Sequence, residues 1–243
     1  QEAKFGDEAT DSEIKLLIDD EKVNLVGTID RIDILKEEGK IYVKIIDYKT
    51  RDKKFSLSDA YNGIDIQLLL YLYAALNAIK DPQSEILPAG AFYFPVINPM
   101  VETSEREPKT IEKQREDRIK ADGIVIDEEE ILDKIGKIDK KRDGRNIFTL
   151  EEVEALIEHI LSDINKNVSK MLSGEIQALP VSQNNGQRTA CDYCRYASIC
   201  RFEADLGDEY RVLYSYDHEQ IRLKLKEEQK NKHKEEQDEH KLD

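Results

Sequence analysis

The most restrictive feature of the sequence is an almost continuously apolar run at residues 64–79. A helix that is apolar on nearly every side is stable only when other parts of the fold enclose it, so we expect a buried helix here. Gln67 is the one strongly polar side chain between Ile66 and Leu76. Tyr71 lies one helical turn later, on the same face. Because an unsatisfied buried amide costs ~1–3 kcal/mol, Gln67 is expected to hydrogen-bond a specific partner.

A β-meander is predicted upstream of this helix. Residues 13–18 and 23–35 mix apolar and polar positions and are followed by a turn at 37–40. The run at 41–46 is β-branched and aromatic, so it is expected to pair back as the next, antiparallel strand. Residues 47–49 then lie at the end of that strand.

Three charged residues of this meander form the candidate catalytic set. Asp47 and Lys49 point to the same face because side chains alternate along a strand, and antiparallel pairing can bring Asp30 alongside Asp47. Two carboxylates can hold Mg²⁺ or Mn²⁺, and a lysine beside them suits phosphodiester hydrolysis. Asp33 falls on the opposite face, where a structural or salt-bridging role is expected. The alternative is that these are solvated strand-end charges and that Gln67 is a satisfied core residue.

The middle of the chain alternates between apolar and strongly charged segments. Residues 91–97 predict another central strand, after a loop bracketed by Pro82 and Pro88. The stretch 102–145 is polar, charged and poor in aromatic residues. We therefore expect a charged helical insertion or mobile excursion over 102–145.

Two helices are predicted in the C-terminal part. Thr149 and Glu152 have capping-box spacing and open a long amphipathic helix, for which Gly174 is the expected cap. A short ordered piece at 210–213 precedes a charge-rich helix that starts at Asp217. Helices of that composition are usually solvated, so it is expected to fray into a solvated tail.

The composition limits where the chain acts and what it binds. It has a net charge of −15, which taken alone disfavours nucleic acid. Much of the acid lies in 102–133 and 227–243, however, and a local basic cluster persists. No apolar run approaches the ~20 residues that span a bilayer, so we expect a cytoplasmic chain with no membrane partner. Because Gln1 is not a natural initiator, we also expect a fragment of a longer protein. The local basic cluster mentioned above consists of Lys49, Arg51, Lys53 and Lys54.

All three cysteines lie close together, at Cys191, Cys194 and Cys200. Clustered cysteines in a cytosolic protein favour metal ligation over disulfides. Thiolates suit an iron–sulfur cluster or zinc, both of which need a fourth ligand at a structural site. A zinc site completed by His218 and unmetallated thiols remain the alternatives.

The order and spacing of these motifs resemble the RecB-like branch of the PD-(D/E)XK nucleases. The matching pieces run from Gly27 to Asp30, from Asp47 to Thr50 and from Gln67 to Tyr71. Residues 27–33 and 88–94 further resemble the B subunits of bacterial AddAB-type helicase–nucleases, and the resemblance covers about residues 2–216. It implies an α/β fold with a restriction-endonuclease-like core, in which helices flank a mixed β-sheet. In that family the acids matching Asp30 and Asp47 bind Mg²⁺, the lysine matching Lys49 positions or activates water, and the pair matching Gln67 and Tyr71 contacts DNA.

The same resemblance implies a cofactor and partners. A cysteine trio of this kind joins a distant upstream cysteine to hold a [4Fe–4S] cluster, so the fourth ligand is expected outside this sequence. The family also has an upstream helix whose histidine or glutamate completes the metal site, and nothing before Lys15 resembles it. The implied function is a DNA exonuclease domain that acts on single-stranded ends in double-strand-break repair, with an AddA-like helicase–nuclease subunit as partner.

Two alternatives remain: a stand-alone Cas4-like nuclease and a non-catalytic DNA-binding or scaffolding domain. We expect the nuclease domain over 1–205, with the insertion at 102–145 and the cysteine segment at 191–200. A C-terminal extension with a charged tail is expected over 206–243.

Overall fold

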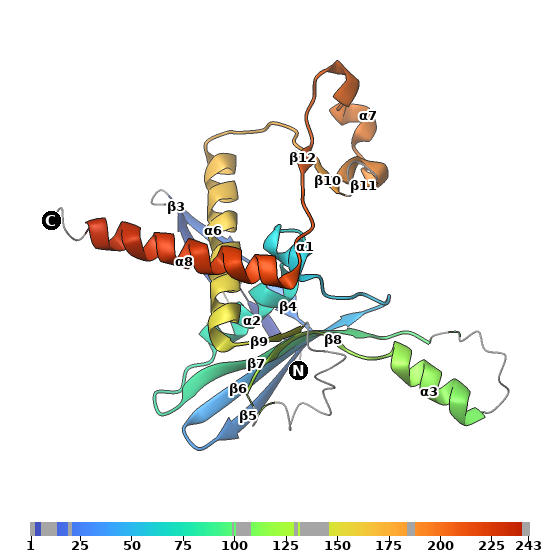
Figure 1. The fold of residues 1–243 in the computed structure, drawn as a ribbon, viewed down its shortest axis with the longest axis vertical. Helices are drawn as coiled ribbons and strands as arrows, with labels where there is room; N and C mark the ends of the chain where they lie inside the picture. The colour runs from blue at the N-terminus through green and yellow to red at the C-terminus, as the bar shows by residue number, and fades with distance from the viewer. Residues whose placement is uncertain are drawn as a thin grey trace.

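A mixed β-sheet with helices packed against it forms the centre of the protein (Figure 1). The computed structural model describes residues 3–5, 14–18, 21–98, 100, 108–128, 131, 146–183 and 188–239. In chain order the elements are β1 (Ala3–Phe5), β2 (Ile14–Ile18), β3 (Glu21–Leu25), β4 (Gly27–Ile29), β5 (Arg31–Glu37), β6 (Lys40–Lys49), α1 (Leu57–Tyr61), α2 (Gln67–Ala78), β7 (Glu85–Pro95), α3 (Pro108–Arg118), β8 (Asp122–Ile126), β9 (Ile147–Phe148), α6 (Leu150–Leu172), β10 (Val181–Gln183), β11 (Arg188–Thr189), the 3-10 helix η3 (Ala190–Tyr193), α7 (Ala197–Cys200), the 3-10 helix η4 (Ala204–Leu206), β12 (Arg211–Val212) and α8 (His218–Glu239).

The principal sheet has five strands in the order β5-β6-β7-β8-β9. β5 and β6 form the predicted antiparallel hairpin, with Glu37 paired to Lys40 across the turn. β6 and β7 are parallel, β7 and β8 antiparallel, and β8 and β9 parallel. The expected mixed sheet of an α/β fold is therefore confirmed.

The connection from β6 to β7 carries both α1 and α2, as a parallel crossover requires. α2 is the predicted buried helix, and it packs against β6, β7 and α6. It starts at Gln67, three residues after the start of the apolar run. Its fully buried side chains are Leu68, Leu69, Leu72, Ala74 and Ala75.

α1 was not predicted, although the sequence carries its start signal. The Ser56 side chain accepts a hydrogen bond from the Asp59 backbone N–H at 3.2 Å, which satisfies a free amide of the first turn. Leu57 and Ala60 are buried beneath it. A helix of five residues is too short to show an apolar period, so only its cap marks it in the sequence.

The expected loop ending at Pro88 is wrong, because Pro88 lies inside the central strand β7. Proline lacks the N–H that a sheet ladder uses, so it is normally confined to edges and bulges. Here the register with β6 shifts between Val43, which pairs with Pro88, and Lys44, which pairs with Gly90. This bulge lets a proline occupy a central strand.

The expectation of an insertion over 102–145 is also wrong in part. Residues 122–126 form β8, an inner strand of the sheet, and Ile124, Val125 and Ile126 are buried. The sequence did not indicate this strand, because its run of three apolar residues is short and charged residues flank it. α3 is helical as expected, and the remainder of the stretch lies largely outside the described residues.

The long helix α6 confirms the predicted capping box, since Thr149 and Glu152 exchange side-chain and backbone hydrogen bonds. It ends at Leu172, and Gly174 adopts a left-handed φ of 82° just beyond it. In Figure 1 α8 crosses α6, and the segment 188–206 projects away from the sheet. Across the part of the chain that is described, no helix has the length and apolarity needed to cross a bilayer.

The predicted charge-rich helix is present as α8, but its first turns are docked on the core and not solvated. Ile221 is 0% exposed and Leu225 5% exposed, and both belong to the main core. Arg222 also forms an ion pair with Glu152 of α6 at 2.9 Å. The helix itself was predicted, but not its docking, because two apolar residues spaced one turn apart suffice to dock a helix whose other positions are mostly charged or polar.

Candidate active site

The end of β6 places a buried carboxylate beside a lysine. The strand runs through the core, where Ile45 is fully buried. At its end, Asp47 and Lys49 lie on the same face of the sheet. Asp47 is only 3% exposed. Its Oδ2 lies 2.5 Å from Lys49 Nζ, yet among the described residues no donor forms a hydrogen bond with that oxygen. Asp47 therefore keeps acceptor capacity in a buried position, which is costly unless a further ligand uses it.

Asp30 reaches the same strand end from the neighbouring chain segment. It comes directly before β5, whose first residue, Arg31, pairs with Ile46. Its Oδ2 accepts a hydrogen bond of 2.8 Å from the backbone N–H of Tyr48. The structure thus brings Asp30 to the stretch that carries Asp47 and Lys49, as the hairpin register predicted.

A chain of hydrogen bonds joins Lys49 to α2. Lys49 Nζ donates to Gln67 Oε1 at 2.8 Å, and Gln67 Nε2 donates to the Tyr71 hydroxyl at 2.9 Å. Gln67 is the first residue of α2 and Tyr71 lies one turn later, so both face β6. The expectation that Gln67 has a specific partner is confirmed. This chain fixes the position of the Lys49 ammonium at the strand end.

A second layer of residues below Lys49 was not predicted from the sequence. Asp65 is 8% exposed and accepts hydrogen bonds from the Tyr93 hydroxyl at 2.5 Å and from Lys53 Nζ at 2.9 Å. The ammonium groups of Lys49 and Lys53 lie 5.1 Å and 4.3 Å from the centre of the Tyr93 ring. The sequence did carry two signals for this layer: Asp65 is an acid just before an apolar helix, and Tyr93 is a tyrosine within an apolar strand.

Burial raises the pKa of the Tyr93 hydroxyl well above its usual value, and its hydrogen bond to Asp65 and the nearby Asp47 charge add to the effect. The phenol therefore stays protonated and can act only as a donor toward Asp65 at neutral pH. Tyr93 also pairs with Asp47 in the β6–β7 register, so this layer lies directly beside the candidate carboxylate.

Asp33 has the structural role predicted for it. It forms ion pairs with Arg31 at 2.7 Å and with Lys44 at 3.0 Å, on the face opposite Asp47. Burial acts to raise the pKa of Asp33, but the hydrogen bonds from Arg31 and Lys44 outweigh it, so the pKa lies below its usual value. Its charge is already balanced, so it has no part in the candidate site.

The donors at the strand end fit a hard divalent cation. Carboxylate oxygens suit Mg²⁺, which one or two protein carboxylates can hold together with water and substrate phosphate. Asp47 Oδ2 and the Asp30 carboxylate provide such donors. Within the described ranges, no three histidine, cysteine or acidic side chains converge on one point. The two carboxylates suit an ion that completes its coordination with water and substrate.

The cysteines lie in the projecting segment that follows β11. Cys191 belongs to η3 and Cys200 ends α7, while Cys194 donates its backbone N–H to the Cys191 carbonyl at 3.1 Å. All three are free thiols, and Cys194 and Cys200 are exposed. His218, the alternative zinc ligand, stacks against Phe148 with ring centroids 6.1 Å apart. As described, these side chains do not form a ligand group.

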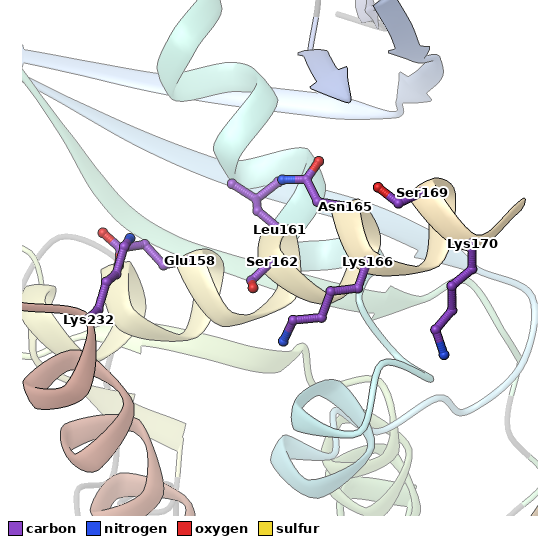
Figure 2. Close-up of a pocket in the computed structure, with 8 residues that line it drawn as sticks. All are labelled: Glu158, Leu161, Ser162, Asn165, Lys166, Ser169, Lys170 and Lys232. Atoms are coloured by element: carbon purple, nitrogen blue, oxygen red, sulfur yellow. The ribbon is translucent and has the colours of Figure 1, made fainter. Parts of the chain in front are cut away.

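Two surface pockets of similar size could each hold a site. One has a volume of about 680 Å³ and lies along α6, where Lys166 and Glu158 line it together with Lys232 of α8 (Figure 2). The other, of about 730 Å³, is lined by Lys49 and the basic cluster that follows it. Of these two, only the second is lined by a candidate catalytic residue, Lys49, so the pocket along α6 is not part of this site.

Comparisons with known proteins converge on one family. The sequence profile of the PD-(D/E)XK nuclease superfamily matches residues 1–201. The chain is 36% identical to the B subunit of the ATP-dependent helicase/deoxyribonuclease of Alkaliphilus oremlandii, over 83% of this chain and 19% of that protein. It is 32% identical to the protein of the same name from a Thermoanaerobacter species, over 90% of this chain and 20% of that protein. The corresponding figures for Clostridium acetobutylicum are 34%, 84% and 19%. The chain therefore spans about one fifth of the length of these relatives.

Proposed function

Because the chain belongs to the PD-(D/E)XK nuclease superfamily, we propose that it is the metal-dependent deoxyribonuclease domain of a helicase–nuclease subunit. Asp30, Asp47 and Lys49 form its catalytic centre in this proposal. The observation that carries it is the buried Asp47 Oδ2, which receives no hydrogen bond from a described residue and lies 2.5 Å from Lys49 Nζ.

Asp30 and Asp47 would hold Mg²⁺, or Mn²⁺ in its place. When bound, such an ion polarises a phosphoryl oxygen and lowers the pKa of bound water. Two carboxylates leave coordination positions for substrate phosphate and water, as cleavage requires. Asp30 is held in place by its hydrogen bond from the Tyr48 backbone.

Lys49 would orient the attacking water and balance negative charge that develops on the phosphate oxygens. Gln67 accepts one proton of the Lys49 ammonium group at 2.8 Å and Asp47 lies 2.5 Å from the same nitrogen, which leaves one of its three protons for substrate. Tyr71 positions the Gln67 amide at 2.9 Å, and we assign this pair to contact with the DNA backbone near the scissile bond.

At the level of the whole protein, the relatives' shared name indicates an ATP-driven helicase that is also a deoxyribonuclease. We therefore propose a cytoplasmic assembly in which an A-type subunit delivers single-stranded DNA ends to this domain during double-strand-break repair. We further propose that Cys191, Cys194 and Cys200 bind a [4Fe–4S] cluster in the longer protein, with a fourth ligand outside this sequence.

The test compares the chain with its Lys49→Ala and Asp47→Asn variants on labelled single-stranded DNA, with Mg²⁺ or Mn²⁺. We expect metal-dependent cutting that falls by at least about a hundredfold in either variant, the scale at which one charge-stabilising group acts in a transition state. We also expect Mn²⁺ to raise the melting temperature of the parent and of Lys49→Ala, but not of Asp47→Asn.

Lys80→Ala is the matched control, since Lys80 is an exposed lysine beyond the end of α2. Cutting that persists unchanged in Lys49→Ala would show that the site is wrongly assigned. No cutting by the parent, together with an equal Mn²⁺ shift in Asp47→Asn, would favour the non-catalytic alternative.

A further inference from the structure

A groove of about 730 Å³ continues from Lys49 along the surface and is built by three separate parts of the chain. The loop after β6 lines it, together with Asp59 of α1 and Asp65 just before α2. Gln183 of β10 and Arg188 of β11, far away in the sequence, complete the lining. The groove thus joins Lys49 to the segment that carries the cysteines.

Cations outnumber carboxylates in this groove, although the whole chain is acidic, with a net charge of −15. Each of its three carboxylates has an internal partner. Asp65 pairs with Lys53 at 2.9 Å and Asp52 with Lys54 at 3.1 Å, while Asp59 accepts a hydrogen bond from Gln183 at 3.2 Å. The groove also contains five cations, which are Lys49, Arg51, Lys53, Lys54 and Arg188.

Arg51 and Arg188 are the cations left over after this pairing. Both are exposed, and neither forms an ion pair with a described residue. One lies in the loop after β6 and the other in β11, so two separate parts of the chain bring them to the groove. Their guanidinium groups can each bind a phosphate through two parallel hydrogen bonds.

The β10–β11 hairpin is held against the core through β12, which pairs with β10, and through the residues that follow β12. Asn62 donates a hydrogen bond to the Tyr214 carbonyl at 3.0 Å, and the Tyr216 backbone donates to Ser58 Oγ at 3.1 Å. Gln183 binds Asp59 of α1 and pairs with Arg188 across the hairpin. These contacts set Arg188 in a defined place relative to Lys49.

We propose that this groove binds the phosphate backbone of single-stranded DNA, with Arg51 and Arg188 each binding a phosphate beside the Lys49 centre. This inference rests on the proposed nuclease function and adds a substrate path to it. It also gives the C-terminal segment a direct part in substrate binding, in addition to any role of its cysteines. A flexible single strand can follow such a groove because its binding depends on backbone charge rather than on base identity.

The test is binding of a fluorescent oligothymidylate to the chain in EDTA, where no cutting occurs, over a range of salt concentrations. We expect Arg51→Gln and Arg188→Gln each to weaken binding about tenfold at low salt, the effect of one charge-assisted contact. The slope of log K against log salt should fall by about 0.7 for each phosphate that a substitution leaves unbound. Arg195→Gln is the matched control, because Arg195 is exposed in the same segment but does not line the groove.

Failure of this inference is distinguishable from failure of the proposed function. If both groove variants bind with the affinity and salt slope of Arg195→Gln, or if the parent does not bind single-stranded DNA at low salt, the groove assignment is wrong. Lys49-dependent cutting would then still support the nuclease. Conversely, arginine-dependent binding without metal-dependent cutting would support the groove and contradict the enzyme.

Discussion

Asp47 and Asp65 are both buried carboxylates near Lys49, but their surroundings differ in a decisive way. Asp65 is compensated inside the protein, since Tyr93 and Lys53 both donate to it. Asp47 Oδ2 has the Lys49 ammonium beside it at 2.5 Å, but no described residue donates a hydrogen bond to it. Burial of a charge is tolerated when it is paired or binds a metal. At the residue scale, Asp65 therefore has a positioning role, and Asp47 is the residue suited to an external ligand.

The contribution of Asp65 can be tested through its partner. Tyr93→Phe removes the hydroxyl that donates to Asp65 while keeping the ring, which is 0% exposed. We expect it to lower the free energy of unfolding by about 1–3 kcal/mol, because a buried carboxylate loses a donor. The measurement is urea unfolding followed by circular dichroism. Tyr193→Phe, at a residue 92% exposed, is the control, and equal stability of the two variants would contradict this role.

At the scale of elements, the errors of prediction occur where packing overrides composition. β8 and α8 both carry few apolar residues within charged sequence, and both are held by the neighbours they contact. β8 lies so close to β7 that Gly123 has no room for a side chain, since a Cβ there would overlap the Ala91 carbonyl oxygen. Local composition cannot reveal such a contact.

The docking of α8 gives a prediction with an internal control. Ile221→Ala should lower the free energy of unfolding by about 2–5 kcal/mol, since it removes a fully buried aliphatic side chain. Leu223→Ala lies on the same helix at a position 62% exposed and should change stability by less than about 0.5 kcal/mol. Denaturant unfolding measures both, and equal effects would mean that α8 does not dock through Ile221.

At the scale of the whole molecule, the segment 188–206 holds the cysteines for which we propose an iron–sulfur cluster. It carries three free cysteines and exposes Tyr193, Tyr196 and Ile199, which are 71–92% exposed. The chain spans about one fifth of the length of its curated relatives. In our proposal, the fourth ligand of the cluster therefore belongs to the longer protein.

The cysteine proposal is testable in the full-length protein purified without oxygen. We expect bound iron and acid-labile sulfide, because three thiolates with a fourth ligand suit an iron–sulfur cluster. Cys194→Ser should lose both, and Ser198→Ala, a neighbouring control, should retain them. Zinc in place of iron would support the alternative zinc site, and absence of any metal would contradict the cluster.

The sequence alone determined the features that depend on local periodicity and spacing. The buried helix, the β5–β6 hairpin and the capping box of α6 follow from patterns that repeat within a few residues. The hairpin register also brought Asp30 toward Asp47, and the lone polar residue of an apolar helix indicated that Gln67 needs a partner.

Only the tertiary structure decided the rest, because it depends on contacts between residues distant in the chain. It placed Asp65 and Tyr93 beneath Lys49, and it docked α8 through Ile221. It also set Arg188 in the same groove as Lys49. Side-chain alternation and helical period specify which face a residue occupies. Which other segment meets that face is set by the packing of the whole chain.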